Sequence, residues 1–205
     1  MQKEAGNLKA RVGILALQGA VKEHADMIKK LDNTEIVLVK KIKELDEIDG
    51  LILPGGESTA MGKLLLDYSM IKPITEMAVS GMPMWGTCAG MILLAKQIDN
   101  QNKTHLNLLD INVVRNGYGG QLDSFETKMC IPAVSQDEIP LVFIRAPYIK
   151  SVGSKVRVLA QLDGKIIAVE EGNLMATSFH PELTKDTSFH QYFLQKIMNW
   201  KKINN

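Results

Sequence analysis

The sequence predicts an α/β fold: a single domain with a mixed, mostly parallel sheet and helices on both faces. Two observations lead to this prediction. Short, almost entirely apolar runs alternate with helix-like segments through the first half of the chain, and no linker or internal repeat divides it. Such apolar runs are typical of parallel strands that helices cover on both sides. A length of 205 residues suits one domain with a sizeable core.

The first half alternates between the two kinds of segment. Strands are predicted at residues 12–17, 35–40, 50–54 and 82–85, and helices at 20–31, 59–66, 74–79 and 89–96. The polar segment 1–10 is predicted to be a flexible leader, and residues 11–205 to form the domain. The order of elements is the one from which parallel sheets are built.

The second half changes character, because apolar runs follow one another with little helix between them. Strands are predicted at residues 106–115, 123–128, 141–147, 156–162, 165–172 and 174–180, and a closing amphipathic helix at 188–200. These strands are expected to be antiparallel pieces that are added to the sheet or return into it.

Charge and cysteine content argue against several classes of protein. Lys and Arg total 24 against 23 Asp and Glu, so the clustered basic excess of a nucleic-acid or anionic-membrane partner is missing. No apolar run approaches the length of a membrane span. Two cysteines are too few for a disulfide framework, which favours a reducing, cytoplasmic setting.

The segment PMWGTCAG places Cys88 between Gly86 and Gly90, where a predicted strand meets a predicted helix. This is the form of a nucleophile elbow, with cysteine in place of serine. The glycines permit a tight, strained turn, and the helix N-terminus favours a thiolate. The backbone N–H of Ala89 is then free to bind an oxyanion. The alternative is a small buried residue, the interpretation that we give to Cys130.

The segment LPGGEST ends a predicted strand and starts a predicted helix, with Ser58 or Thr59 as its cap. A plain turn explains the glycines and the cap, but not Glu57. In a functional interpretation, Gly55 and Gly56 form a flexible peptide that presents an amide to an oxyanion. A phosphate loop is a poor match, because the Gly-Lys-Ser/Thr ending is absent.

The segment SFHPE follows the last predicted strand and offers the base that a thiol nucleophile needs. His180 and Glu182 leave the same face of an extended chain, and Pro181 keeps the residue before it extended. The alternatives are a solvated surface turn and a zinc site with Cys88, for which no paired ligand spacing exists.

Five further residues have side chains that such a site could use. His24, His105 and His190 are interpreted as ordinary helix or loop-edge residues. Arg115 and Arg145 each end an apolar run, which suits a surface charge at a strand end. The alternative is that they capture a carboxylate, for which the guanidinium fork is well shaped.

Taken together, these segments resemble a known family. LALQGAVKEH, LILPGGESTAMGKLL, PMWGTCAGMILLA, VVRNGYGGQLDSFE, FIRAP and SFHPELTKD, in this order, are similar to the glutaminase subunits of pyridoxal 5′-phosphate synthase, which are class I (triad) glutamine amidotransferases. The resemblance extends from about Val12 to the final helix. It implies a three-layer, flavodoxin-like arrangement.

The resemblance also implies roles for individual residues. Cys88 would be the nucleophile, His180 the general base and acid, and Glu182 the residue that orients His180. The amides of Gly56 and Ala89 would form the oxyanion hole. The residues expected to hold glutamine are Gly56, Glu57, Ser58, Arg115, Ile144 and Arg145.

The same resemblance implies a partner and no metal or cofactor. The partner is a (β/α)8-barrel synthase subunit, with twelve copies of each subunit in the assembly, and ammonia passes to it through an internal route. The glutaminase is expected to be poorly active until docked, and the LQGAVKEH segment is expected to help to sense docking.

The chain departs from the family pattern at two positions, because Gly120 stands where arginine is usual and Tyr118 where phenylalanine is usual. Two other classes of function stay open at this level. One is a non-catalytic docking subunit, and the other is a different cysteine hydrolase, such as a γ-glutamyl peptidase or a member of the stress-response glutaminase-like group.

Overall fold

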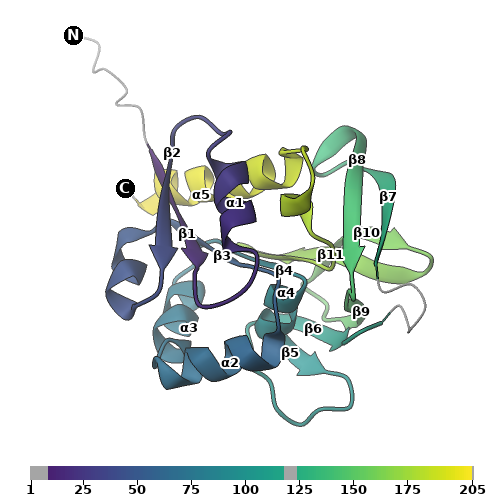
Figure 1. The fold of residues 1–205 in the computed structure, drawn as a ribbon, viewed down its shortest axis with the longest axis horizontal. Coiled ribbons are helices and arrows are strands. Elements are labelled where there is room, and N and C mark those ends of the chain that lie inside the picture. The colour runs from purple at the N-terminus through teal and green to yellow at the C-terminus, as the bar shows by residue number, and fades with distance from the viewer. Residues whose placement is uncertain (1–8, 118–123, 205) are drawn as a thin grey trace.

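The computed structural model describes residues 9–117 and 124–204, and within them a ten-stranded sheet forms the centre of the molecule (Figure 1). Its path runs β2-β1-β3-β4-β12-β11-β9-β6-β5, with β10 paired to β11 off this path. The predicted fold class is therefore confirmed: an α/β domain with a mixed sheet between helical layers.

One half of the sheet is entirely parallel. Its strands are β1 (Ala10–Leu15), β2 (Thr34–Val39), β3 (Gly50–Leu53), β4 (Met84–Thr87) and β12 (Leu174–Thr177). The pairs β1–β2, β1–β3, β3–β4 and β4–β12 are all parallel. The carboxyl ends of these strands therefore meet at one edge, where open α/β sheets bind their ligands.

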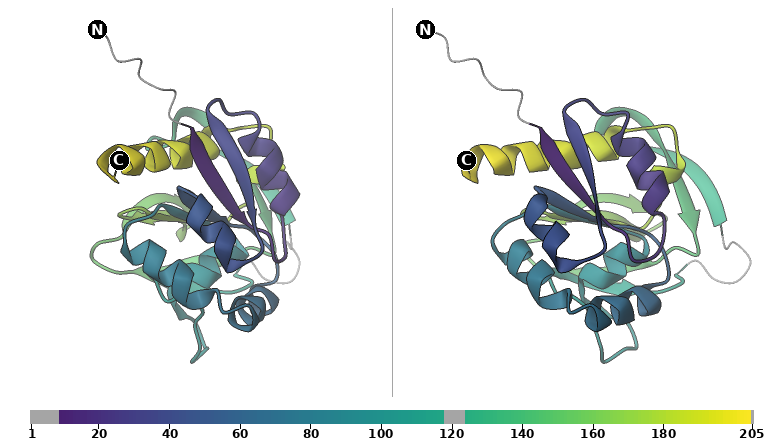
Figure 2. Two further views of the ribbon diagram at one scale, coloured as in Figure 1. Left: turned by 90° about the vertical axis from the view of Figure 1, so that its left-hand side faces the viewer. Right: turned by 60° about the vertical axis from the view of Figure 1, so that its left-hand side comes forward.

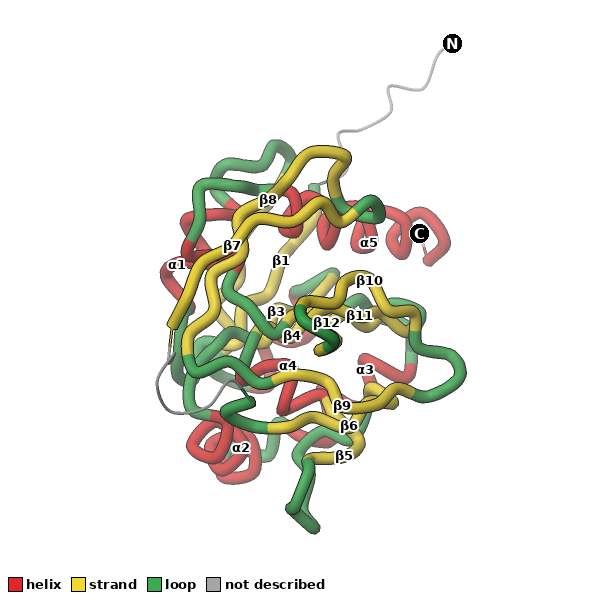
Figure 3. The backbone as a smooth tube through the Cα atoms, turned by 90° about the vertical axis from the view of Figure 1, so that its right-hand side faces the viewer, coloured by secondary structure: helices red, strands yellow, loops and turns green. Residues whose placement is uncertain are grey.

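The other half is mostly antiparallel, as the change in the sequence pattern predicts. It contains β5 (Ala95–Ile98), β6 (Leu109–Val114), β9 (Tyr148–Val152), β10 (Arg157–Leu162) and β11 (Lys165–Glu171). A separate two-stranded sheet of β7 (Ser124–Ile131) and β8 (Ser135–Ile144) lies beside it, as the tube in Figure 3 shows.

The helices cover both faces of the sheet, as the side views in Figure 2 show. One face carries α1 (Val21–Ile28) and α5 (Ser188–Asn204), and the other carries α2 (Ser58–Asp67), α3 (Ile71–Val79) and α4 (Ala89–Leu94). Two 3₁₀ segments, η1 (Ile42–Glu47) and η2 (Pro181–Leu183), complete the described elements. Among the described residues, no helix is both long and apolar enough to cross a membrane.

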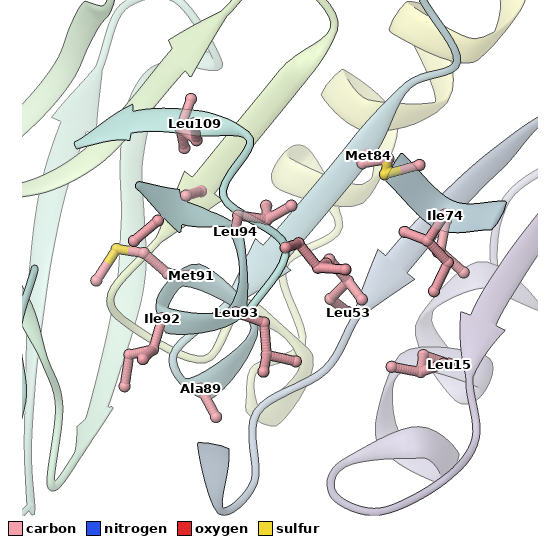
Figure 4. Close-up of a cluster of buried hydrophobic side chains, with 14 of the residues drawn as sticks. Leu15, Leu53, Ile74, Met84, Ala89, Met91, Ile92, Leu93, Leu94 and Leu109 are labelled. Atoms are coloured by element: carbon pink, nitrogen blue, oxygen red, sulfur yellow. The ribbon is translucent and has the colours of Figure 1, made fainter. Parts of the chain in front are cut away.

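Successive side chains along the strands contribute alternately to two separate hydrophobic cores. Met84 belongs to the cluster under α2, α3 and α4, whereas the next residue, Trp85, belongs to the cluster under α1 and α5. Figure 4 shows Met84 with Leu53 and Leu94 in the first of these clusters. Because successive residues of a strand point to opposite faces, a strand buried on both sides must be apolar throughout.

Some element boundaries differ from the sequence prediction. The segment 89–96 is not one helix, because α4 ends at Leu94 and the chain continues as β5. Of the segment 141–147, only residues 141–144 are strand, as the end of the longer β8, and a further strand, β9, follows. Ala10, assigned to the leader, already belongs to β1, while residues 1–8 lie outside the described part.

The backbone is closely packed where β4 turns into α4. A methyl group at Gly90 would overlap the carbonyl oxygen of Leu53 at the end of β3, and one at Gly86 would overlap the backbone of Gly90. Helix α4 can therefore start directly against the sheet, at its ligand-binding edge, only because both positions lack a side chain.

Gly90→Ala should lower the free energy of unfolding by about 3 kcal/mol, because backbone atoms cannot make room for the methyl group. Helix propensity acts in the opposite direction, because alanine is the better helix former by about 1 kcal/mol. A loss of stability would therefore come from the contact with the Leu53 carbonyl. The measurement is urea denaturation, with Gly164→Ala as control. Gly164 has φ +75°, and no atom lies within 4 Å of the place that a methyl group would take there, so the strain alone should cost about 1 kcal/mol. Equal losses in the two variants would contradict the prediction.

Candidate active site

Cys88 occupies the strained turn that the sequence predicts. Its φ of 49° lies in the left-handed region, which a side chain rarely adopts. The residue is the N-cap of α4, its N–H donates to the carbonyl of Thr177 on β12 at 2.8 Å, and 7% of its surface is exposed. Backbone strain held in place by a neighbouring strand is a common feature of nucleophile elbows.

His180 and Glu182 form a buried pair immediately after β12. His180 Nδ1 lies 2.7 Å from Glu182 Oε1, and both side chains are almost fully enclosed. The N–H of His180 donates to the carbonyl of Val142 on β8 at 2.8 Å, so the two-stranded sheet also fixes this segment. The solvated surface turn that the sequence left open does not occur.

The charges of this pair are mutually stabilised. Burial alone would lower the pKa of His180, but its hydrogen bonds to Cys88 and Glu182, together with their charges, raise it to about 10. Burial would likewise raise the pKa of Glu182, but the nearby His24 and His180 hold it below its ordinary value. At neutral pH the structure therefore favours an imidazolium at His180 and a carboxylate at Glu182.

The Gly55-Gly56 peptide packs directly on the Cys88–His180 pair. A methyl group at Gly55 would overlap the ring of His180. The N–H of Ala20 donates to the carbonyl of Gly55 at 2.9 Å, and no described peptide bond is cis. Because the C=O and N–H of a trans peptide point in opposite directions, the Gly56 N–H points away from Ala20.

The Glu57 carboxylate has three hydrogen-bond partners at the edge of the site. Its carboxylate caps α2, accepting from the N–H groups of Thr59 at 3.0 Å and Ala60 at 2.6 Å. The cap predicted at Ser58 or Thr59 is therefore wrong, because the longer carboxylate reaches both amides. Arg115 Nη2 donates to Glu57 Oε1 at 3.3 Å. Partial burial acts to raise the pKa of Glu57, but these hydrogen bonds and Arg115 lower it.

A cavity of about 680 Å³ brings the predicted site residues together. Its lining includes Cys88, His180, Gly56, Ala89, Glu57, Ser58, Arg115, Ile144 and Arg145. Glu182 is the one predicted site residue outside the lining, since it lies behind His180. Residues that are far apart in the chain therefore line the same cavity as Cys88: Gly56 and His180, for example, are more than 120 positions apart.

The end of β8 and the turn after it line part of this cavity. Arg145, with φ 43°, follows Ile144 directly, and Asn116, with φ 50°, follows Arg115. The N–H of Gly117 donates to the carbonyl of Ala146 at 3.0 Å, which ties the two turns together. Two arginines therefore line a cavity that also contains the Glu57 carboxylate, which is paired with Arg115.

His24 and His190 lie on helices, as expected, but neither is at an exposed edge of its element. Both are fully buried, and they form a pair in which His24 Nδ1 lies 3.1 Å from His190 Nε2. His24 Nε2 lies 3.5 Å from Glu182 Oε2. His105 is half-buried against Gly62 of α2, outside the cavity lining.

Sequence reasoning also missed Gln18, which lines the cavity and accepts the N–H of Glu57 at 2.9 Å through Oε1. A polar residue directly after the first strand was the available signal. The departures at Tyr118 and Gly120 lie outside the described residues. Among the described residues, no group of three or more histidines, cysteines, aspartates or glutamates could hold a metal ion.

The sequence model of the SNO glutamine amidotransferase family matches residues 14–199 of this chain. The chain belongs to the SNO glutamine amidotransferase family. This glutamine amidotransferase is accordingly a glutaminase, and the match spans every segment that contributes to the cavity.

Named relatives and a solved structure agree with this assignment. A pyridoxal 5′-phosphate synthase subunit PdxT from Ruminiclostridium cellulolyticum is 54% identical over 91% of this chain and 99% of its own. A protein of the same name from a Thermoanaerobacter species is 56% identical over 90% of this chain and 98% of its own. A crystal structure described as a glutamine amidotransferase superimposes with a TM-score of 0.85 at 39% identity, covering 91% of this chain and 98% of the other.

The free energy of unfolding should fall as the pH drops below 6.5, the ordinary pKa of histidine. Burial lowers the pKa of His24, against a partial opposing effect of Glu182, and lowers that of His190 well below 6.5. The unfolded chain therefore binds protons that the folded chain does not, which costs up to about 1.4 kcal/mol per pH unit for each histidine. His180 does not oppose this loss. Its raised pKa gives stability that is complete below 6.5 and is lost progressively as the pH rises from there through about 10.

Urea denaturation on either side of pH 6.5 measures this dependence. His190→Phe removes one of the two buried titrating groups, so the slope should decrease by about half in that variant. A free energy of unfolding that stays constant from neutral pH down to about pH 5 would contradict the prediction.

Proposed function

We propose that this protein is the glutaminase subunit of a pyridoxal 5′-phosphate synthase. It hydrolyses L-glutamine to L-glutamate and ammonia and delivers the ammonia to a synthase subunit for vitamin B6 biosynthesis. The observation that carries the proposal is Cys88 on a strained turn beside the His180–Glu182 pair, next to a cavity lined by one carboxylate and two arginines. The names of the relatives support the biosynthetic assignment.

In the proposed mechanism, Cys88 attacks the side-chain amide carbon of glutamine as a thiolate. The carbonyl oxygen becomes an oxyanion that accepts hydrogen bonds from the N–H groups of Gly56 and Ala89. His180, protonated at neutral pH, gives its proton to the departing nitrogen, so that ammonia leaves and a γ-glutamyl thioester remains. His180 then takes a proton from water, the hydroxide displaces the thiolate, and glutamate is released.

The charged groups around the cavity match the two ends of glutamine. Glu57 is assigned to the ammonium group, and Arg115 and Arg145 to the α-carboxylate, for which the guanidinium fork is suited. Gly56, Ser58 and Ile144 complete the contacts. Without glutamine, Glu57 and Arg115 pair with each other, so substrate binding exchanges one ion pair for two.

The partner is proposed to be a (β/α)8-barrel synthase subunit in a twelve-plus-twelve assembly that works in the cytoplasm. The sequence resemblance supports this part of the proposal, as does the word "subunit" in the names of the relatives. The glutaminase itself uses no metal or cofactor, because the thiolate, the imidazole and the backbone amides supply all the groups that amide hydrolysis needs.

Cys88→Ala should reduce glutamine hydrolysis by at least about 10³-fold, because no other group can form the thioester. Ammonia release is measured with and without a cognate synthase subunit, which should increase the wild-type rate. Cys130→Ala is the matched control, since Cys130 is exposed and outside the cavity, and it should keep wild-type activity.

Hydrolysis retained in Cys88→Ala would overturn the mechanism. The absence of hydrolysis by the wild type under any partner condition would favour a non-catalytic docking subunit. A preference for γ-glutamyl peptides over free glutamine would favour a different cysteine hydrolase.

Arg115→Met should raise the KM for glutamine by about 10- to 100-fold, with a smaller effect on kcat, because a charge-assisted hydrogen bond to the carboxylate is lost. Arg157→Met is the control: Arg157 forms a surface ion pair with Glu170 at 2.9 Å and does not line the cavity. Steady-state kinetics on the complete complex measure both variants. An unchanged KM in Arg115→Met would exclude the carboxylate contact.

A further inference from the structure

His24 lies on the far side of the proposed triad from the cavity. It is a buried residue of α1 with no exposed surface, and it does not line the cavity. Its Nε2 lies 3.5 Å from Glu182 Oε2 and 3.1 Å from Thr87 Oγ1, one residue before the nucleophile. The mechanism above gives this buried imidazole no role.

The second carboxylate oxygen of Glu182 needs a donor. Glu182 Oε1 is paired with His180 Nδ1, but Oε2 is fully buried and has no hydrogen bond among the described residues. A buried, ionised carboxylate oxygen without a partner is costly. His24 Nε2 lies 3.5 Å from it, at ion-pair distance.

The donors and acceptors around His24 select one tautomer. A carboxylate can only accept and the Thr87 hydroxyl can accept as well, so a proton on His24 Nε2 suits both of its neighbours, whereas a lone pair there would face the carboxylate repulsively. His24 Nδ1 is then an acceptor for the Nε2–H of His190 at 3.1 Å. That leaves His190 Nδ1 as a bare lone pair, and this atom indeed has no hydrogen-bond partner among the described residues.

With this tautomer, each of the two histidines donates a proton to the next group: His190 donates to His24, and His24 donates toward the Glu182 carboxylate. His190 fixes the ring of His24, and the ring edge of Trp85 confines both of them. The charged or titratable groups that act on the pair are Glu182, His180, Glu23 and Lys30. Burial nevertheless lowers the pKa of His24, so it stays a neutral donor that does not compete with the charged His180.

We propose that His24 is a positioning residue: its Nε2–H, backed by His190, holds the free oxygen of Glu182 so that the other oxygen faces His180. The inference rests on the proposed Cys88–His180–Glu182 triad. It adds α1 and α5 to the elements that set the geometry of the reaction, because His24 and His190 come from these two helices.

Three variants test this role in the full-length protein. His24→Leu removes the donor and keeps an apolar side chain of moderate size. His24→Gln keeps an N–H at about the distance of Nε2 from the backbone. Ile28→Ala is the control, because Ile28 is a fully buried residue of the same helix that does not line the cavity.

In the complete complex, kcat for glutamine should fall about tenfold or more in His24→Leu, with KM little changed. His24→Gln should recover most of the loss, and Ile28→Ala should keep wild-type kcat despite lower stability. Equal kcat losses in His24→Leu and Ile28→Ala, or no recovery in His24→Gln, would overturn the proposal.

A second readout does not depend on turnover. In the isolated chain, NMR titration of labelled histidines upward from neutral pH should give a lower pKa for His180 in His24→Leu than in the wild type, where it is about 10. The same spectra should show wild-type His24 as the neutral Nε2–H tautomer. Protonation of His24 on Nδ1 instead would overturn the proposal even if His24→Leu fails to fold.

The two readouts separate this inference from the mechanism that it extends. If wild-type His180 titrates near the ordinary value for histidine, the triad itself is wrong. If His180 titrates high in the wild type and unchanged in His24→Leu, the triad stands and the role of His24 is wrong.

Discussion

The close contact between α4 and the end of β3 is the constraint on which this site depends. Gly90 lies against the carbonyl of Leu53, and Gly86 lies against Gly90, so α4 begins directly on the sheet. A chain that turns this sharply carries Cys88 in the left-handed region, with its side chain at the sheet edge. The Gly55-Gly56 peptide follows the same end of β3, so the end of this strand positions both the proposed nucleophile and the proposed oxyanion donor.

Three buried polar side chains, His180, Glu182 and His24, also help to hold the site in place. The two histidines flank the carboxylate and have opposite pKa shifts. His180 has the charges of Cys88 and Glu182 beside it, so its pKa rises, whereas burial dominates at His24. Groups whose environments separate their pKa values in this way are suited to different tasks. We assign proton transfer to His180 and the positioning of Glu182 to His24.

Much of the fold followed from the sequence, because apolar runs that are buried on both faces leave a clear pattern. The strands at β1, β3 and β4 and the helices after them were found within a few residues. The end of α4 was not, because the apolar run continues past Leu94 into β5 without a breaking residue. Only pairing with β6 makes Ala95–Ile98 a strand, and this pairing is a tertiary contact.

The sequence by itself determined the turn at Cys88 and the His180–Glu182 pair. The glycines that permit the turn and the two-residue spacing of the pair are local features of the sequence, and the contact of Gly90 with Leu53 and the hydrogen bond from His180 to Val142 hold them in place. Only the tertiary structure decided that His24 stands behind Glu182 and that His190, 166 positions away, stands behind His24. Helical spacing can mark such a residue as buried, but which side chain it meets depends on how whole layers pack against the sheet.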